Sequence, residues 1–186
     1  MKRTTIKNST ILIKIFGLAL LCCTLITSCS NEGEEPAPDL DPDNPGSLLS
    51  APDFELNSVD GKTVKLADFS DKVVVLFFFG NTCPSCRAVA PDIEKELNLP
   101  YDGRDDYAII GLDQWDGNSN SVMSFQDNTM VTFPLLLNAS GVARAYDTTY
   151  DRLMVIDKNG KIALKGRRGA TNDVSIIKSK VDELLN

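Results

Sequence analysis

The sequence predicts an α/β domain in which a mixed central sheet is flanked by helices, and three patterns carry this prediction. Residues 73–80 (VVVLFFFG) form an uninterrupted apolar run with the length of a central strand buried on both faces. Residues 107–115 (YAIIGLDQW) have the pattern of a second buried strand. Helical patterns at 84–97 and 119–129 follow these two strands, and strands that alternate with helices build a sheet covered by helices.

Shorter elements complete the expected fold. Alternating residues around Asp60-Gly61 predict a β-hairpin over 53–65, because Asp-Gly favours the tight turns that join antiparallel strands. The rest of the chain predicts, in order, a short strand at 134–138, a short helix at 141–146, an antiparallel hairpin of 152–157 and 161–165, and an amphipathic helix at 173–185 with Asn172 or Asp173 near its start.

The first 28 of the 186 residues have the composition of an export signal. They contain four basic residues and no acidic one, and an apolar run occupies 15–26. Twelve residues are too few to span a bilayer comfortably, so we predict a cleaved signal rather than a membrane anchor. The run ends in Leu-Ile-Thr-Ser-Cys, which resembles a bacterial lipoprotein box and implies cleavage before Cys29 and lipidation of Cys29. The alternative is an ordinary signal cut nearby, which leaves Cys29 as a spare thiol.

Residues 29–50 predict a disordered tether, and 51–186 the folded domain. The tether holds four of the nine prolines and six acidic residues, and its few apolar residues cannot form a core. Its expected role is to hold the domain away from the lipid surface.

Composition excludes several functions. The chain contains no histidine, which excludes Ser-His-Asp and Cys-His catalysis and histidine-ligated zinc. Its net charge of −7 argues against nucleic acid as a partner, since nucleic-acid-binding proteins need a basic face.

One cysteine pair carries the predicted chemistry. Cys22 and Cys23 leave with the signal and Cys29 is consumed by lipid, so the domain keeps Cys83-Pro84-Ser85-Cys86. The pair follows a buried strand and begins a helix, where free backbone N–H groups favour a thiolate. Zinc would need two more cysteine or histidine ligands, which the domain lacks. We therefore predict a thiol–disulfide site, with a purely structural pair as the alternative.

Residues 78–91 (FFGNTCPSCRAVAP) resemble the active-site segment of thioredoxin-fold proteins, including the proline five residues after the second cysteine. The leading hairpin, the helical insert and the ending RLMVIDKNGKI are similar to the envelope TlpA/ResA-like branch of the redoxin (AhpC/TSA) group. The resemblance covers 51–186 and implies a thioredoxin-like fold. It also implies a dithiol without metal or organic cofactor, in which Cys83 attacks and Cys86 resolves. The implied partners are protein thiols or disulfides and an envelope electron donor, and we expect a monomer.

The sequence departs from this family around the site. Thioredoxins carry a buried Asp six residues before the first cysteine, where this chain has Phe77, and the envelope reductases often carry Glu where it has Val89. Phe79 and Thr82 stand where tryptophans are common. The usual proton acceptors for the resolving cysteine are therefore missing.

The family's cis-proline is also absent. Counting back from Asp157 along the 152–157 strand reaches Asp151 instead. Because a cis bond before a non-proline residue costs about 3 kcal/mol, we expect a trans loop. Asp151 is either a relocated proton acceptor facing the dithiol or a surface residue paired with Arg152 or Arg144.

The leading function is a lipid-anchored thiol–disulfide oxidoreductase in the cell envelope, facing the periplasm, and a reductase rather than an oxidant. One alternative is a thioredoxin-fold binding module whose exchange chemistry has decayed. Another is a peroxiredoxin-like peroxidase, which needs a Thr three residues before the attacking cysteine, where Gly80 stands.

We expect the Cys83 sulfur to be partly accessible and Cys86 to be buried. Trp115 and Asp113 lie at the end of the second predicted long strand, and ligand sites in open α/β sheets are found at strand ends of this kind. We expect Trp115 to be a packing residue and not a substrate-binding one.

Overall fold

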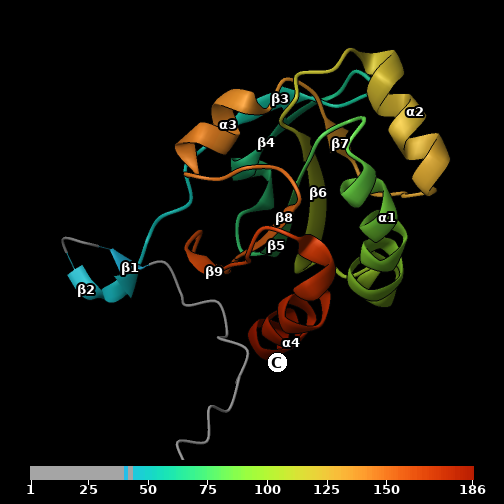
Figure 1. Cartoon of the computed structure of the whole chain (residues 1–186). Coiled ribbons are helices and arrows are strands. Elements are labelled where there is room, and N and C mark those ends of the chain that lie inside the picture. Colours follow the sequence, from blue (N-terminus) through green and yellow to red (C-terminus); the bar gives the residue numbers. More distant parts are fainter. Residues whose placement is uncertain (1–39, 42–43) are drawn as a thin grey trace, which may run out of the picture. The chain divides into compact units, whose positions relative to one another are not determined.

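The computed structural model describes residues 40–41 and 44–186, with side chains described from residue 47 onward (Figure 1). The strands are β1 (Leu40–Asp41), β2 (Asn44–Leu48), β3 (Glu55–Asn57), β4 (Thr63–Lys65), β5 (Val73–Phe79), β6 (Tyr107–Asp113), β7 (Leu135–Leu136), β8 (Arg152–Ile156) and β9 (Ile162–Lys165). The α-helices are α1 (Pro84–Ile93), α2 (Ser119–Thr129), α3 (Ser140–Ala145) and α4 (Val174–Leu185). Short turns of other helix types are η1 (Leu66–Phe69), η2 (Glu94–Asn98), η3 (Leu99–Tyr101) and η4 (Ala170–Asn172).

The central sheet has five strands in the order β7-β6-β5-β8-β9. β5 runs parallel to β6, with Val73 opposite Tyr107 and Phe79 opposite Asp113, and β6 runs parallel to β7. β8 is antiparallel to both β5 and β9. The sheet is therefore mixed, and β5 lies in its centre, as the sequence predicted.

The uninterrupted apolar run of β5 is explained by the two layers that cover the sheet. Val73, Val75, Phe77 and Phe79 alternate into a core shared with α1, α2 and α4. The intervening residues of β5 point into a second core with α3, η1 and the start of the domain. Each strand residue is at most 1% exposed, so both faces need apolar side chains. Burying one such large side chain contributes roughly 1.5–3 kcal/mol.

α1 ends earlier than the helical pattern at 84–97 predicted. Pro91 lies inside it, lacks the backbone N–H that would continue the ladder, and crowds the preceding turn. The chain continues as the π-helical turn η2 and then the 3₁₀ turn η3, so the segment stays helical with different hydrogen bonding. The other predicted elements are confirmed to within two residues, and α2 has the predicted bounds.

The N-terminal boundary differs from the expected one. β1 and β2 pair as a short antiparallel ladder within the predicted tether, with Leu40 opposite Leu48. Leu49 already accepts a hydrogen bond from Ile162 (2.9 Å), and Ser50 forms a bridge with Lys161. Ordered contacts with β9 therefore begin two residues before the expected start at residue 51.

The predicted signal, Cys29 and the tether up to residue 39 lie outside the described residues. Within the described part of the chain, no helix has both the length and the hydropathy to cross a membrane.

Candidate active site

The cysteine pair lies at the start of α1, immediately beyond the carboxyl end of β5. Cys83 is the N-cap residue of α1, Pro84 occupies the first turn, and Cys86 follows in the same turn. The two cysteines form a disulfide with a Cα–Cα separation of 5.3 Å. The Cys86 backbone N–H donates to the Cys83 sulfur at 3.1 Å, and the Ser85 hydroxyl lies 3.3 Å from the same sulfur. Donors at this position stabilise negative charge on Cys83 once the disulfide is reduced.

Both cysteines are buried in this disulfide form. Cys83 is 1% exposed and Cys86 0% exposed, so the expectation of a partly accessible Cys83 sulfur is wrong for this state. The cause is packing, since both belong to the apolar cluster that also contains Phe79 and Leu153. Thr82, Pro84 and Ser85 are exposed around them. Attack on this disulfide therefore requires a local shift of the residues that cover it.

A buried carboxylate fastens the loop that leads into Cys83. Asp113, at the end of β6, is 0% exposed and accepts hydrogen bonds from the Asn81 backbone N–H (3.1 Å) and side-chain amide (3.0 Å). It also accepts from the backbone N–H groups of Gly117 (2.7 Å) and Trp115 (3.3 Å). Asp113 thus joins the loop after β5 to the loop after β6. The sequence placed Asp113 near the site, but it gave no signal that Asn81 was its partner.

Gly80 is required by the position of Trp115. A Cβ at residue 80 would lie 2.4 Å from the Trp115 Cδ2 atom, so the indole rests on the glycine backbone. Cys83 donates its backbone N–H to the Gly80 carbonyl at 3.0 Å, which puts the indole beside the dithiol loop. Trp115 is 41% exposed, and its ring meets that of Tyr150 edge-on at 4.9 Å. It therefore packs, as predicted, but it also presents an open aromatic surface next to the site.

Asp151 lies one residue before β8, beyond the pairing of Phe78 with Arg152. It is 6% exposed, its φ is 59°, and the bond to Tyr150 is trans as expected. Its carboxylate accepts a hydrogen bond from the Ala170 backbone N–H at 3.3 Å. The alternative in which Asp151 turns to the surface is therefore wrong.

Neither of the two arginines considered as partners of Asp151 is found in a hydrogen bond with it. Arg144 donates to the Ser140 hydroxyl at 3.4 Å, and the Arg152 Nε atom is buried without a hydrogen-bond partner. The positive φ of Asp151 is a conformation that proline cannot adopt, because its ring holds φ near −65°. A proline at position 151 would therefore require the loop to change conformation.

Apolar side chains occupy both positions at which the family resemblance implied a carboxylate. Phe77 is 0% exposed and its ring stacks on Phe79 with centroids 5.7 Å apart. Val89 is 1% exposed and packs in the same cluster as the two cysteines. A carboxylate at either position would be surrounded by hydrocarbon, which favours its neutral form.

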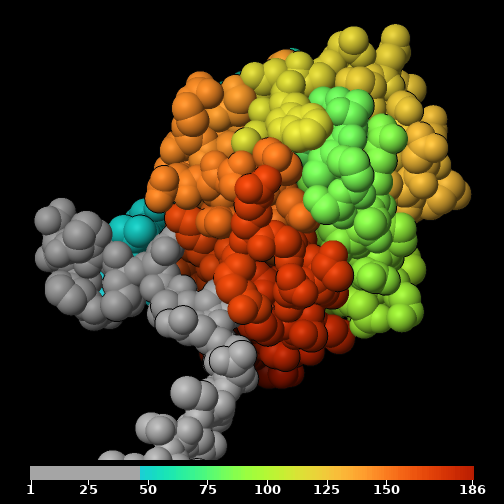
Figure 2. All heavy atoms as spheres, in the orientation of Figure 1, coloured from blue at the N-terminus to red at the C-terminus, as the bar shows by residue number. Residues whose placement is uncertain are grey.

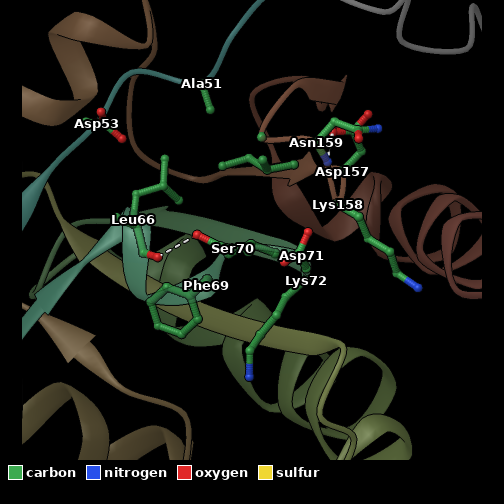
Figure 3. A pocket seen from close by; sticks show the side chains of 14 residues that line it. Ala51, Asp53, Leu66, Phe69, Ser70, Asp71, Lys72, Asp157, Lys158 and Asn159 are labelled. Carbon is green, nitrogen blue, oxygen red and sulfur yellow. Dashed lines mark hydrogen bonds between the residues drawn. The ribbon is translucent and has the colours of Figure 1, made fainter.

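A cavity of about 470 Å³ lies away from the dithiol, at the other end of β5 (Figure 3). Its lining includes Ser70, Lys72 and Val74 at the start of β5 and Lys158 in the β8–β9 turn. The dithiol follows the opposite end of the strand, so this cavity is no part of the candidate site. Among the described residues, no group of three or more metal-ligating side chains is placed to hold a metal ion.

Residues 49–165 match the AhpC/TSA family model, which is more than half of the chain. The chain belongs to the AhpC/TSA family. This match confirms the resemblance inferred from the CxxC segment and accounts for the thioredoxin-like arrangement of β5, α1 and β8 around the cysteines.

Two curated relatives and one solved structure are similar to this chain. The chain is 29% identical over 113 residues to the thioredoxin-like protein YneN of Bacillus subtilis, covering 60% of this chain and 66% of the relative. It is 32% identical over 120 residues to the thiol-disulfide oxidoreductase ResA of Geobacillus thermodenitrificans, covering 61% and 64%. The chain therefore spans slightly less than two thirds of the length of these curated relatives. The solution structure of a "putative protein disulfide isomerase" from Bacteroides thetaiotaomicron superposes with a TM-score of 0.69 at 30% identity, covering 81% of this chain and 94% of that one.

Proposed function

We propose that this protein is a thiol–disulfide oxidoreductase that reduces disulfides of partner proteins through Cys83 and Cys86. The observation that carries the proposal is the position of Cys83 as the N-cap of α1, with the Cys86 N–H directed at its sulfur. This environment favours the thiolate form that attacks a disulfide. Membership of the AhpC/TSA family and similarity to a ResA protein support the same chemistry.

The exchange proceeds in two balanced steps. The Cys83 thiolate attacks one sulfur of a partner disulfide, a mixed disulfide forms, and the other partner sulfur leaves as a thiolate. The Cys86 thiolate then attacks the Cys83 sulfur, which closes the Cys83–Cys86 disulfide and releases the second partner thiolate. Two electrons pass to the partner, whose thiolates take up protons. A thiol reductant of the envelope must then reduce the Cys83–Cys86 disulfide for another cycle.

Asp151 is our candidate for the group that takes the Cys86 proton. Two buried carboxylates, Asp113 and Asp151, lie at the end of the sheet that bears the dithiol. Both oxygens of Asp113 already accept hydrogen bonds from N–H donors. In Asp151 one oxygen accepts from Ala170, which leaves capacity for a proton.

The peroxidase alternative is disfavoured by the surroundings of Gly80. A peroxidatic site needs a threonine side chain at that position, and the Trp115 indole fills the space that its first carbon would take. The binding-module alternative keeps the fold without exchange. Reduction of insulin separates it from the proposed function, and consumption of hydrogen peroxide by the reduced protein would favour the peroxidase.

Cysteine variants test the roles of the two thiols. Cys86→Ser should trap mixed disulfides with partner proteins, because the resolving attack is lost, whereas Cys83→Ser should trap few. Non-reducing electrophoresis after rapid alkylation measures both. Equal trapping by the two variants would contradict the assigned order of attack.

We also propose that Cys29 carries lipid and that the domain faces the periplasm from the cell envelope. The basis is the Leu-Ile-Thr-Ser-Cys sequence and the acidic, proline-rich segment that follows it. Cys29→Ser should move the protein out of the detergent phase or leave it unprocessed, while Cys23→Ser, the same change within the signal, should alter neither. Normal partitioning of Cys29→Ser would contradict the lipid anchor.

A further inference from the structure

Three side chains from separate loops form a continuous strip beside the dithiol, which we call the aromatic strip: Trp115, Tyr150 and Arg168. Trp115 rests on Gly80, and the Tyr150 ring meets it edge-on at 4.9 Å. The Arg168 guanidinium lies over the Tyr150 ring, 4.8 Å from its centroid, and donates a hydrogen bond to the Tyr150 hydroxyl at 2.8 Å. In Figure 2 the yellow segment between β6 and α2 lies against both the green start of α1 and the orange segment beside it.

Hydrogen bonds to two buried residues at the end of the sheet, Asp113 and Asp151, fix the backbone of the strip. Asp113 accepts a hydrogen bond from the Trp115 backbone N–H at 3.3 Å. The Asp151 carbonyl accepts from the Gly169 backbone N–H at 2.8 Å, which joins the residue after Tyr150 to the residue after Arg168. A surface fixed in this way loses little conformational freedom when a partner binds.

Charge decides what the strip can recognise. Arg168 is exposed, and no carboxylate among the described residues forms an ion pair with it. The neighbouring Arg167 is instead paired with buried Asp173, with 2.9 Å between nitrogen and oxygen. Arg168 is therefore an available cation, presented on an aromatic surface, in a chain whose net charge is −7. A guanidinium so placed suits a carboxylate of a bound polypeptide.

We propose that the aromatic strip selects partner polypeptides that carry an acidic side chain close to the reactive disulfide. This inference rests on the proposed function, because the polypeptide is the substrate of the dithiol. The successive spacings of 4.9 Å and 4.8 Å mean that about three residues of extended chain, at most, reach from the Trp115 ring to the Arg168 guanidinium. The acidic residue should therefore lie about three positions beyond the residue whose backbone packs against Trp115, and so three or more positions from the attacked cysteine.

Peptides of one sequence test the proposal. Each contains one disulfide and differs in a single residue, which is Glu, Gln or Lys; separate sets place this residue three, four or five positions from the cysteine. The reduced protein is mixed with each peptide, and kcat/KM is measured with a thiol reductant present. Binding is followed separately through the fluorescence of Trp115, the one tryptophan of the chain. The proteins compared are wild type, Arg168→Gln, Arg168→Glu and the control Lys72→Glu, which makes the same charge change at the far end of β5.

With the wild type, kcat/KM for the Glu peptide should be about two- to fivefold higher than for the Gln peptide, as expected for one exposed ion pair. Arg168→Gln should abolish this preference, Arg168→Glu should invert it in favour of the Lys peptide, and Lys72→Glu should keep it. The preference should shrink at high ionic strength. Equal kcat/KM for the three peptides with wild type, or a preference that survives Arg168→Glu, would overturn the proposal.

The proposed function fails in a different way. If wild type does not exchange even a small uncharged disulfide, the thiol chemistry is absent. Trp115 fluorescence still decides whether the strip prefers the Glu peptide, because binding needs no exchange. Tighter binding of the Glu peptide to wild type, lost in Arg168→Gln, would then support the strip as a recognition surface.

Discussion

Asp113→Asn should destabilise the protein and loosen the loop that carries Cys83. The substitution keeps the size of the side chain but replaces one acceptor oxygen with an NH₂ group. Asp113 uses both oxygens: Oδ1 faces the Asn81 backbone N–H at 3.1 Å, and Oδ2 faces the Gly117 N–H at 2.7 Å. Whichever way the new amide is turned, its NH₂ group confronts a backbone donor in a site that is 0% exposed.

The size of the effect follows from the number of donors affected. One backbone N–H left without an acceptor in a buried site costs about 1–3 kcal/mol. The remaining bonds lose the charge assistance of a carboxylate, which removes on the order of 1 kcal/mol more. The expected loss in the free energy of unfolding is therefore about 2–4 kcal/mol. With an m-value of roughly 1–3 kcal/mol/M for urea, the midpoint should fall by on the order of 1–2 M.

Urea unfolding followed by circular dichroism measures the loss, and the Cys83–Cys86 redox potential reports the state of the loop. Asp116→Asn is the matched control, because Asp116 is exposed and accepts one hydrogen bond from the Ser140 N–H at 3.0 Å, which an Asn oxygen can also accept. Ordinary surface substitutions change the free energy of unfolding by about 0.5 kcal/mol or less. A free energy of unfolding of Asp113→Asn within about 0.5 kcal/mol of the wild-type value would therefore refute the reasoning.

Three further changes test other parts of the structure. Gly80→Ala should push the Trp115 indole outward, at a cost of about 1–3 kcal/mol for overpacking, and an unchanged Trp115 emission maximum would contradict this. Asp173→Ala removes the acceptor for the backbone N–H and guanidinium of Arg167, so thermal unfolding should show a Tm lower by several degrees; an equal Tm would argue against a structural role. Burial raises the pKa of Tyr146, so its contribution to stability is complete below about pH 10 and is lost as the pH rises toward its folded pKa. Tyr146→Phe should therefore lose less stability than wild type between pH 9 and 11 in urea unfolding, and parallel losses would contradict the assignment.

The cysteine pair and most elements of the fold could be predicted from the sequence because their signals are local. The apolar run of β5 and the bounds of α2 are set by side-chain periodicity and by capping residues within a few positions. The CxxC pair, in a domain without other cysteines or histidines, indicates its own chemistry through composition. Even the early end of α1 has a local cause in Pro91.

The surroundings of the dithiol were decided by tertiary structure. Asn81 and Asp113 are 32 positions apart and meet because β5 and β6 pair in parallel register. The buried state of Cys83 and the inward turn of Asp151 likewise depend on segments brought together by the sheet. Each pairing depends on strand order and on a register in which a shift of one residue would reverse every side chain. Periodicity within a segment shows which residues are buried, but the residues that meet at the end of a sheet are determined by how its strands align.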